Sequence, residues 1–164
     1  KALEKGLLDP CVMHLHPKDD MPRAQFLMVL FKALRIAGKR PYLGEFCDLS
    51  RYEWDSSYVQ ACIEENFIDP NTVSNGRFRP DDPLTREEFA SFVIRGMKKN
   101  ILERNLSLEE CLKQAVENGI LSEKGEKQER ICRADCYAGL VRAMEIIGNL
   151  DMALPSDTEV HPVG

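Results

Sequence analysis

The stretch FRPDDPLTREEFASFVIRGM, residues 78–97, indicates the fold because it contains the end of a loop and the start of a helix. Two prolines in its first half prevent a helix from extending back into the loop. Thr85 and Glu88 have the spacing of a capping box, in which each side chain accepts a hydrogen bond from the backbone N–H of the other residue. We therefore predict a helix that begins at Arg86.

The same pattern of a helix-start arginine and an apolar stripe occurs three times in the chain. Arg86 is followed at helical spacing by Phe89, Phe92, Val93 and Met97. Arg23 begins the copy RAQF and Arg133 begins the copy RADC. Their stripes are Phe26, Val29, Leu30 and Leu34 in the first copy, and Cys136, Gly139, Leu140 and Met144 in the third. Such self-similarity is typical of repeat architectures.

A second helical element precedes each arginine. The segments KGLLDP (5–10), ENFIDP (65–70) and NGILS (118–122) each close an amphipathic segment, so the repeated unit is helix, variable loop and capped helix. We predict an all-α fold with a single domain over residues 1–148, whose repeats cover approximately 1–40, 46–100 and 105–148. Residues 149–164 lack periodicity and are predicted to be a tail or linker. The first copy lacks the start of its first helix, which suggests a piece of a longer protein.

The composition excludes several classes of protein. Apolar residues make up 43% and charged residues 30% of the 164 positions, as in a soluble globular domain. A net charge of −5 does not favour nucleic-acid binding, and no apolar run approaches the roughly 20 residues of a membrane span. Six cysteines occur without a CxxC pair. We expect most of them to be free and buried.

Residues 46–97 resemble one complete S-layer homology repeat. The matching residues are Phe46, Asp48, Leu49, Trp54, Asn66, Phe67, Ile68, Gly76, Phe78, Pro80, Leu84, Thr85, Arg86, Glu87, Glu88 and Phe89. The flanking copies keep fewer matches, mainly around Arg23 and Arg133, and lack the Gly-x-Phe-x-Pro loop. In the third copy, Ser107 stands where the family pattern has its Trp.

The resemblance implies a pseudo-threefold bundle of three helix-loop-helix repeats, with grooves that bind secondary cell-wall polysaccharide, often through pyruvylated N-acetylmannosamine. It also implies a non-catalytic anchoring module, without a cofactor, on the bacterial cell surface, in the cell wall or S-layer. The expected partner is an anionic cell-wall glycan. The expected ligand-binding residues are Arg23, Arg86, Arg133, Trp54 and Gly76, with Arg86 as the strongest candidate.

Physical chemistry gives the arginines the same function by a separate argument. Free N–H groups at a helix N-terminus attract anions, and a neighbouring guanidinium can hold a carboxylate with two hydrogen bonds. A pyruvate ketal on a sugar supplies such a carboxylate. Alternatively, each arginine pairs with an acidic residue of an adjacent repeat. The residues available for this are Asp19, Asp20, Asp81, Asp82 and Glu129.

Other interpretations remain open or are rejected. A lone Trp such as Trp54 is more commonly buried at a repeat junction than stacked on a sugar. The main rival function is a protein–protein module whose glycan pockets have eroded, and a further possibility is an anchor within a catalytic assembly. Cys11, His14 and His16 match no zinc module, and residues 69–76 do not fit a calcium loop. No catalytic triad or carboxylate pair is evident, so we expect neither metal nor catalysis.

Overall fold

The computed structural model describes residues 16–68 and 74–153, and within these ranges it contains helices and no β-strand. The elements are α1 (Arg23–Leu34), α2 (Ser56–Glu64), η3 (Ser74–Gly76), α3 (Arg86–Met97), η4 (Ile101–Arg104), α4 (Leu108–Glu117) and α5 (Arg133–Ala153), where η denotes a 3₁₀ helix. The predicted all-α class is confirmed for the described residues. The final helix α5 runs to Ala153, beyond residue 148 where we expected the domain to end.

The three predicted helix starts are confirmed, since α1, α3 and α5 begin at Arg23, Arg86 and Arg133. At α3 the capping box is present: Thr85 Oγ1 accepts from the N–H of Glu88 at 3.2 Å, and Glu88 Oε1 accepts from the N–H of Thr85 at 3.3 Å. These bonds satisfy N–H groups that a helix leaves unpaired at its start.

Helices α2 and α4 end in the same way. The residues Asn66 and Gly119 follow them in the left-handed region, at φ 59° and 70°. The next residues, Phe67 and Ile120, donate their N–H groups to carbonyls in the last turn of each helix, at 2.9 and 2.8 Å. This Schellman-type ending reverses the chain and directs Phe67 and Ile120 into the core, where both are buried.

A ring of backbone hydrogen bonds joins the three helix starts. The N–H of each arginine donates to a carbonyl in the loop before the next helix start in the cycle: Arg23 to Asp82 at 3.0 Å, Arg86 to Glu129 at 2.8 Å and Arg133 to Asp19 at 2.9 Å. The residues after them do the same: Ala24 to Pro80 at 2.9 Å, Glu87 to Lys127 at 3.0 Å and Ala134 to Pro17 at 2.9 Å. The three copies therefore contact one another cyclically at this end.

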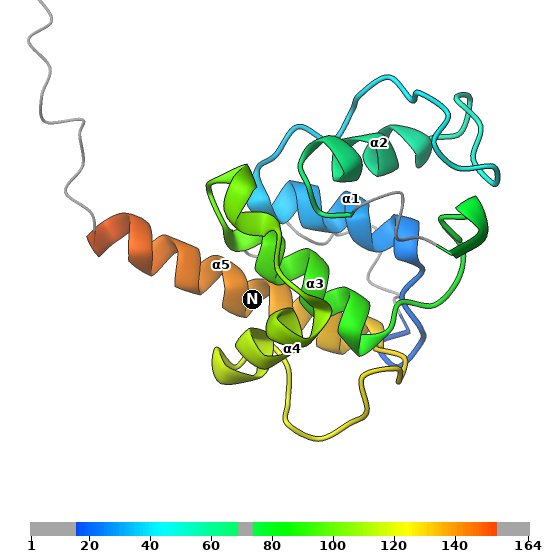
Figure 1. The fold of residues 1–164 in the computed structure, drawn as a ribbon. Coiled ribbons are helices and arrows are strands. Elements are labelled where there is room, and N and C mark those ends of the chain that lie inside the picture. Colours follow the sequence, from blue (N-terminus) through cyan, green and yellow to red (C-terminus); the bar gives the residue numbers. More distant parts are fainter. Residues whose placement is uncertain (1–15, 69–73, 154–164) are drawn as a thin grey trace, which may run out of the picture.

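Helices α1, α3 and α5 contact one another (Figure 1), and the apolar residues on their facing sides belong to the hydrophobic core. Phe26 on α1 packs against Phe89 and Phe92 on α3, with ring centroids 5.3 and 6.2 Å apart. In each stripe the first three predicted residues are buried. The fourth residues are partly buried: Leu34, Met97 and Met144. The predicted apolar stripes are therefore confirmed as the inward faces of all three helices.

Five cysteines in the described residues carry free thiols, as expected. Cys62, Cys111 and Cys136 are buried, and burial raises the pKa of each thiol above its usual value. A raised pKa keeps these thiols neutral and unreactive at physiological pH. Cys47 is exposed, and Cys11 lies outside the described residues.

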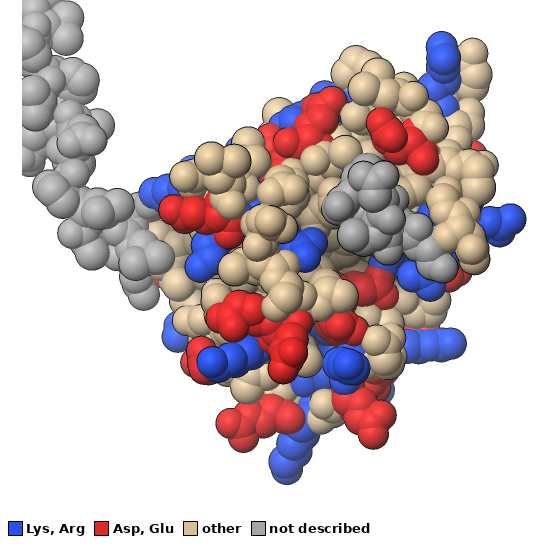
Figure 2. All heavy atoms as spheres, viewed as in Figure 1, with Lys and Arg blue, Asp and Glu red and all other residues tan. Residues whose placement is uncertain are grey.

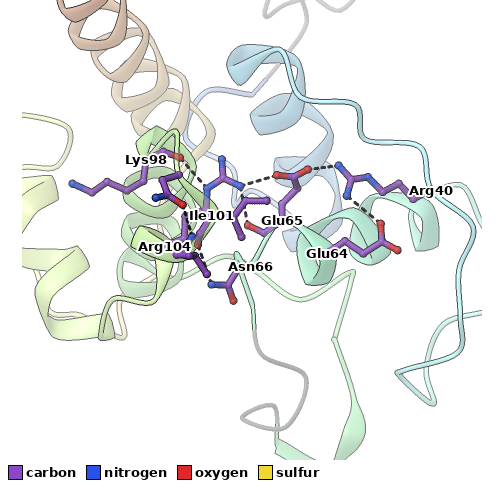
Figure 3. Close-up of polar contacts among 9 residues, drawn as sticks. Arg40, Glu64, Glu65, Asn66, Lys98, Ile101 and Arg104 are labelled. Atoms are coloured by element: carbon purple, nitrogen blue, oxygen red, sulfur yellow. Dashed lines mark hydrogen bonds and ion pairs between the residues drawn. The ribbon is translucent and has the colours of Figure 1, made fainter.

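A charged network fastens the end of α2 to the segments on either side of it (Figure 3). Glu65 lies between the guanidinium groups of Arg40 and Arg104, and it forms an ion pair with each of them. Arg104 also donates to the backbone carbonyl of Glu65 at 2.8 Å, and its guanidinium lies 4.8 Å from the ring centroid of Phe67. Glu65 is therefore a link between parts of the chain before and after α2.

Candidate functional site

Arg23 is buried and its guanidinium is bound by groups of its own chain. Only 5% of the residue is exposed; Nε donates to the carbonyl of Phe78 at 3.0 Å, and NH1 forms an ion pair with Glu88. The guanidinium carbon also lies 4.7 Å from the centroid of the Phe78 ring. The face of an aromatic ring attracts a cation, so this contact stabilises the charged guanidinium. Burial, assisted by the positive charge of Arg79, lowers the pKa of Arg23 to about 10, so the side chain stays charged at neutral pH.

A groove of about 510 Å³ opens beside Arg23. Its lining is rich in charged and hydrogen-bonding groups: Arg23, Arg79, Arg95, Thr85, Glu87, Glu88, Ser91, Ser107 and Gln128, with Phe67, Ile68, Phe92 and Leu108 as the apolar part. Arg95 is fixed by donating to the carbonyls of Phe67 and Leu106 at 2.6 and 2.8 Å. Arg79 has 54% of its side chain exposed. The groove therefore has one exposed guanidinium beside two held ones.

The Gly-x-Phe-x-Pro loop is shaped by Asp48. Its carboxylate accepts the N–H groups of Phe78 at 2.9 Å and Arg79 at 2.8 Å. Phe78, an apolar residue in a polar loop, is fully buried. Gly76 is exposed and has φ 63°, a conformation that glycine adopts without steric cost. The loop thus presents Arg79 to the groove while its phenylalanine supports Arg23.

Arg86 occupies the equivalent place in the second copy, with different neighbours. It is 8% exposed, and one terminal nitrogen donates to the carbonyl of Ser122 at 2.6 Å. Its Nε is buried and has no hydrogen-bond partner among the described residues. Gly125 lies against it: a Cβ added to this glycine would be 2.9 Å from Nε. Arg86 therefore keeps a donor that an incoming acceptor could satisfy.

Arg133 is half-buried and is also incompletely satisfied. One terminal nitrogen donates to Gln25 Oε1 at 2.8 Å, and the other is buried without a partner within the part of the chain that the structure describes. Of the three arginines, only Arg23 forms an ion pair with a described residue. Its partner is Glu88, which is none of the five acidic residues considered from the sequence. Among the described residues, the alternative in which an arginine pairs with an acidic residue thus applies to Arg23 alone. Its partner Glu88 is the residue that we had assigned to the capping box.

The expectation of free N–H groups at these helix starts is wrong for the first two residues of each helix. The backbone ring occupies those groups with carbonyls of the adjacent copy, as at Arg86 and Glu87, which donate to Glu129 and Lys127. Sequence could not reveal this, because the carbonyls come from loops of different length and composition. Anion binding here would rest on the guanidinium groups.

The expectation that Trp54 is buried at a repeat junction is also wrong, since 57% of it is exposed. The physical reason is that Tyr58 takes the inner position, with its ring 6.1 Å from that of Phe31. Trp54 rests edge-on against Tyr58 at 6.3 Å. An exposed indole is compatible with the alternative interpretation, stacking on a sugar.

The described residues contain no cluster of three or more His, Cys, Asp or Glu side chains arranged to hold a metal ion. Of the three zinc ligands considered from the sequence, Cys11 and His14 lie outside the described residues and His16 is exposed. Most of the segment 69–76, which was considered as a calcium loop, also lies outside the described residues. None of the described helices is both long enough and apolar enough for a membrane span. On the face shown in Figure 2, acidic and basic side chains are intermixed.

Comparison with known proteins agrees with the resemblance seen in the sequence. Residues 45–90 match the family model described as the S-layer homology domain. The chain is 35% identical over 95 residues to an endoglucanase from Bacillus sp. (strain KSM-635), covering 57% of this chain and 9% of the relative. It is 30% identical over 79 residues to the exoglucanase XynX from Acetivibrio thermocellus, covering 48% of this chain and 7% of the relative.

The matched region contains part of the lining of the Arg23 groove, namely Phe67, Ile68, Arg79, Thr85, Glu87 and Glu88. It includes α2, the loop carrying Phe78 and Arg79, and the start of α3 with Arg86. The chain spans less than a tenth of the length of either relative. S-layer homology domains are non-catalytic modules that anchor proteins to the bacterial cell wall. Residues 45–90 of this chain are therefore similar to the S-layer homology domain family.

Proposed function

We propose that this chain anchors a surface protein, without catalysis, to an anionic secondary cell-wall polysaccharide outside the bacterial cell. The observation that carries the proposal is that three arginines occupy equivalent positions, joined by one ring of backbone hydrogen bonds, within a chain whose middle region is an S-layer homology domain. This ring supports extending the assignment to three repeats that form a pseudo-threefold bundle.

The ligand chemistry follows from the donors that are not fully used. Arg86 and Arg133 each have a buried guanidinium nitrogen with no hydrogen-bond partner among the described residues. A buried unpaired donor costs about 1–3 kcal/mol, so a carboxylate that reaches it gains a charge-assisted hydrogen bond and removes that cost. The pyruvate ketal of a pyruvylated glycan supplies this carboxylate. Trp54 offers a face for a sugar ring, and Gly76 allows close approach of the loop.

The test is binding to cell walls that do or do not carry pyruvate ketals, measured by co-sedimentation. Arg86→Gln keeps most of the side-chain volume but removes the charge, and we expect at least about tenfold weaker binding, equivalent to about 1.4 kcal/mol. Arg77→Gln is the matched control because Arg77 is exposed and does not line the Arg23 groove. Circular dichroism and thermal unfolding verify that each variant is folded.

A second variant distinguishes binding in the Arg23 groove from binding at Arg86. Arg79→Gln removes the exposed guanidinium of the Arg23 groove, where the present partner is Asp82 at 3.6 Å, so little stability should be lost. Weaker binding by this variant places ligand in that groove. Equal sedimentation of wild type, Arg86→Gln and Arg79→Gln, or no dependence on pyruvate, would overturn the proposal.

The second candidate function is a protein-docking module built on the same scaffold. The observation in its favour is that Glu88 already pairs with Arg23, so a carboxylate of the chain itself occupies one of the three expected anchor points. Large apolar side chains such as Tyr52 and Leu102 are also exposed, at 89% and 82%. In this case pyruvylated walls would fail to sediment the protein, and a purified protein partner would bind with unchanged affinity to Arg86→Gln.

A further inference from the structure

The ends of α1 and α3, together with the middle of α5, form a second groove, at the opposite end of α1 and α3 from their arginine starts. It has a volume of about 540 Å³. Its floor contains Leu34, Met97 and Met144, the fourth residue of each apolar stripe. Gly96 permits this arrangement, because a Cβ there would lie 2.3 Å from Leu34 Cδ1. The three stripes thus end in a shared apolar surface instead of closing the core completely.

The rim of this groove is basic. The charged residues that line it are Arg35, Lys98, Lys99 and Arg104, and no Asp or Glu is among the described residues of its lining. This concentration of positive charge contrasts with a chain whose net charge is −5. A helix C-terminus attracts cations, but α1 and α3 already carry Lys32 and Arg95 in their last turns. The further basic residues exceed what the helix ends need.

Two of these cations are available to a ligand. Arg104 is held by Glu65 and by the carbonyl of Lys98, which accepts from its Nε at 3.0 Å. The side chains of Arg35 and Lys98 form no ion pair with any residue in 16–68 or 74–153. Both follow directly after the last residue of their helices, at equivalent positions of the first and second copies. They contribute two positively charged side chains to a lining that also contains the apolar residues Leu34, Met97 and Met144.

We propose that this groove binds a single-chain anionic amphiphile, with the aliphatic chain on the Leu34, Met97 and Met144 floor and a carboxylate or phosphate head between Arg35 and Lys98. The volume falls in the range of small-molecule pockets, which are mainly apolar with a few polar groups that fix orientation. The two methionines suit a flexible chain because their unbranched side chains adapt to irregular shapes. The site is independent of the glycan anchor.

Sodium decanoate below its micelle concentration is the probe, with 1-decanol and acetate as comparators. Isothermal titration should give saturable one-to-one binding of decanoate, at least tenfold tighter than either comparator, since each comparator lacks one part of the amphiphile. The double variant Arg35→Gln/Lys98→Gln should weaken decanoate binding at least tenfold. Lys32→Gln/Lys113→Gln changes the charge equally at exposed lysines outside the groove and should bind like wild type.

Gly148→Leu tests the position of the aliphatic chain. Gly148 lines the groove, and a Cβ there would meet no atom of the described residues within 4 Å, so there is room for a side chain at this position. We expect loss of decanoate binding with an unchanged or raised unfolding temperature, because glycine disfavours a helix interior. Absence of saturable decanoate binding, equal losses in both double variants, or unchanged binding by Gly148→Leu would overturn the proposal. Loss of cell-wall binding in Arg86→Gln would not affect it.

Discussion

The first and second helix starts share one backbone arrangement and differ in what surrounds the arginine. At Arg23, Phe78 supplies an aromatic face and a carbonyl, and Glu88 supplies a carboxylate. At Arg86, the position equivalent to Phe78 is Gly125, and one nitrogen of the guanidinium has no partner among the described residues. The comparison shows that the ring of backbone hydrogen bonds forms without the Gly-x-Phe-x-Pro loop. The arginine guanidinium, in contrast, has more partners where this loop is present.

The ends of α2 and α4, the helices that precede Arg86 and Arg133, also differ in how many side chains hold them. At the end of α2, Glu65 is held by both Arg40 and Arg104 (Figure 3). At the end of α4, the equivalent residue is Asn118, whose carbonyl accepts from Arg142 at 3.2 Å. Among the described residues, side-chain links are therefore denser at the end of α2 than at the end of α4. The following predictions test whether this difference is energetic as well as geometric.

The largest effect is expected at Phe78. Replacement of this fully buried ring by alanine should lower the free energy of unfolding by about 3–5 kcal/mol, because a cavity forms and the cation–π contact with Arg23 is lost. Urea denaturation measures this value. Phe78→Leu keeps most of the apolar volume and should lose less. A loss below about 1 kcal/mol for Phe78→Ala would show that the aromatic support of Arg23 is dispensable.

A smaller effect is expected at the equivalent position, Gly125. This residue has φ 126°, and an added Cβ would lie 2.8 Å from Glu129 Oε2 and 2.9 Å from Arg86 Nε. Gly125→Ala should therefore cost about 1–3 kcal/mol through backbone strain and displacement of Arg86.

The control for Gly125 is Gly44→Ala. Gly44 has φ 91°, and no atom of the described residues lies within 4 Å of an added Cβ, so it carries the strain without the contact. Thermal unfolding of both variants separates the two causes. Equal losses would show that Gly125 matters for its backbone conformation alone and does not shape the surroundings of Arg86.

Sequence predicted the local structure well because its causes are local. The capping residues Thr85 and Glu88 fixed one helix start, and the arginine alignment transferred that start to Arg23 and Arg133. The buried stripes followed from helical periodicity, since positions on one face are set by the spacing alone. The burial of Phe78 was also predictable, because a lone aromatic residue in a polar loop gains most from the core.

Side-chain partners between copies were not predictable from the sequence. Glu88 serves both the capping box and Arg23, and the second function depends on how two copies face each other. The exposure of Trp54 depends on Tyr58 taking the inner position, although either aromatic residue fits the local pattern. The basic groove required knowledge that α1 and α3 end beside α5. Each of these features arises from contacts distant in sequence.

The smallest predicted effect concerns Glu65 and depends on pH. Burial raises the pKa of Glu65, but the hydrogen bonds from Arg40 and Arg104 outweigh it, so the pKa lies below its ordinary value of 4.5. A carboxylate with a lowered pKa stabilises the fold above pH 4.5, and this stabilisation is lost as the pH falls through the folded-state pKa. At pH 7, Glu65→Gln should cost about 1 kcal/mol, and the difference from wild type should shrink below pH 4.5.

Glu64→Gln is the matched control, because Glu64 binds the same Arg40 but its side chain is 40% exposed. If urea denaturation gives equal losses for the two variants at pH 7, or a pH-independent loss for Glu65→Gln, the link through Glu65 does not distinguish the end of α2 from that of α4.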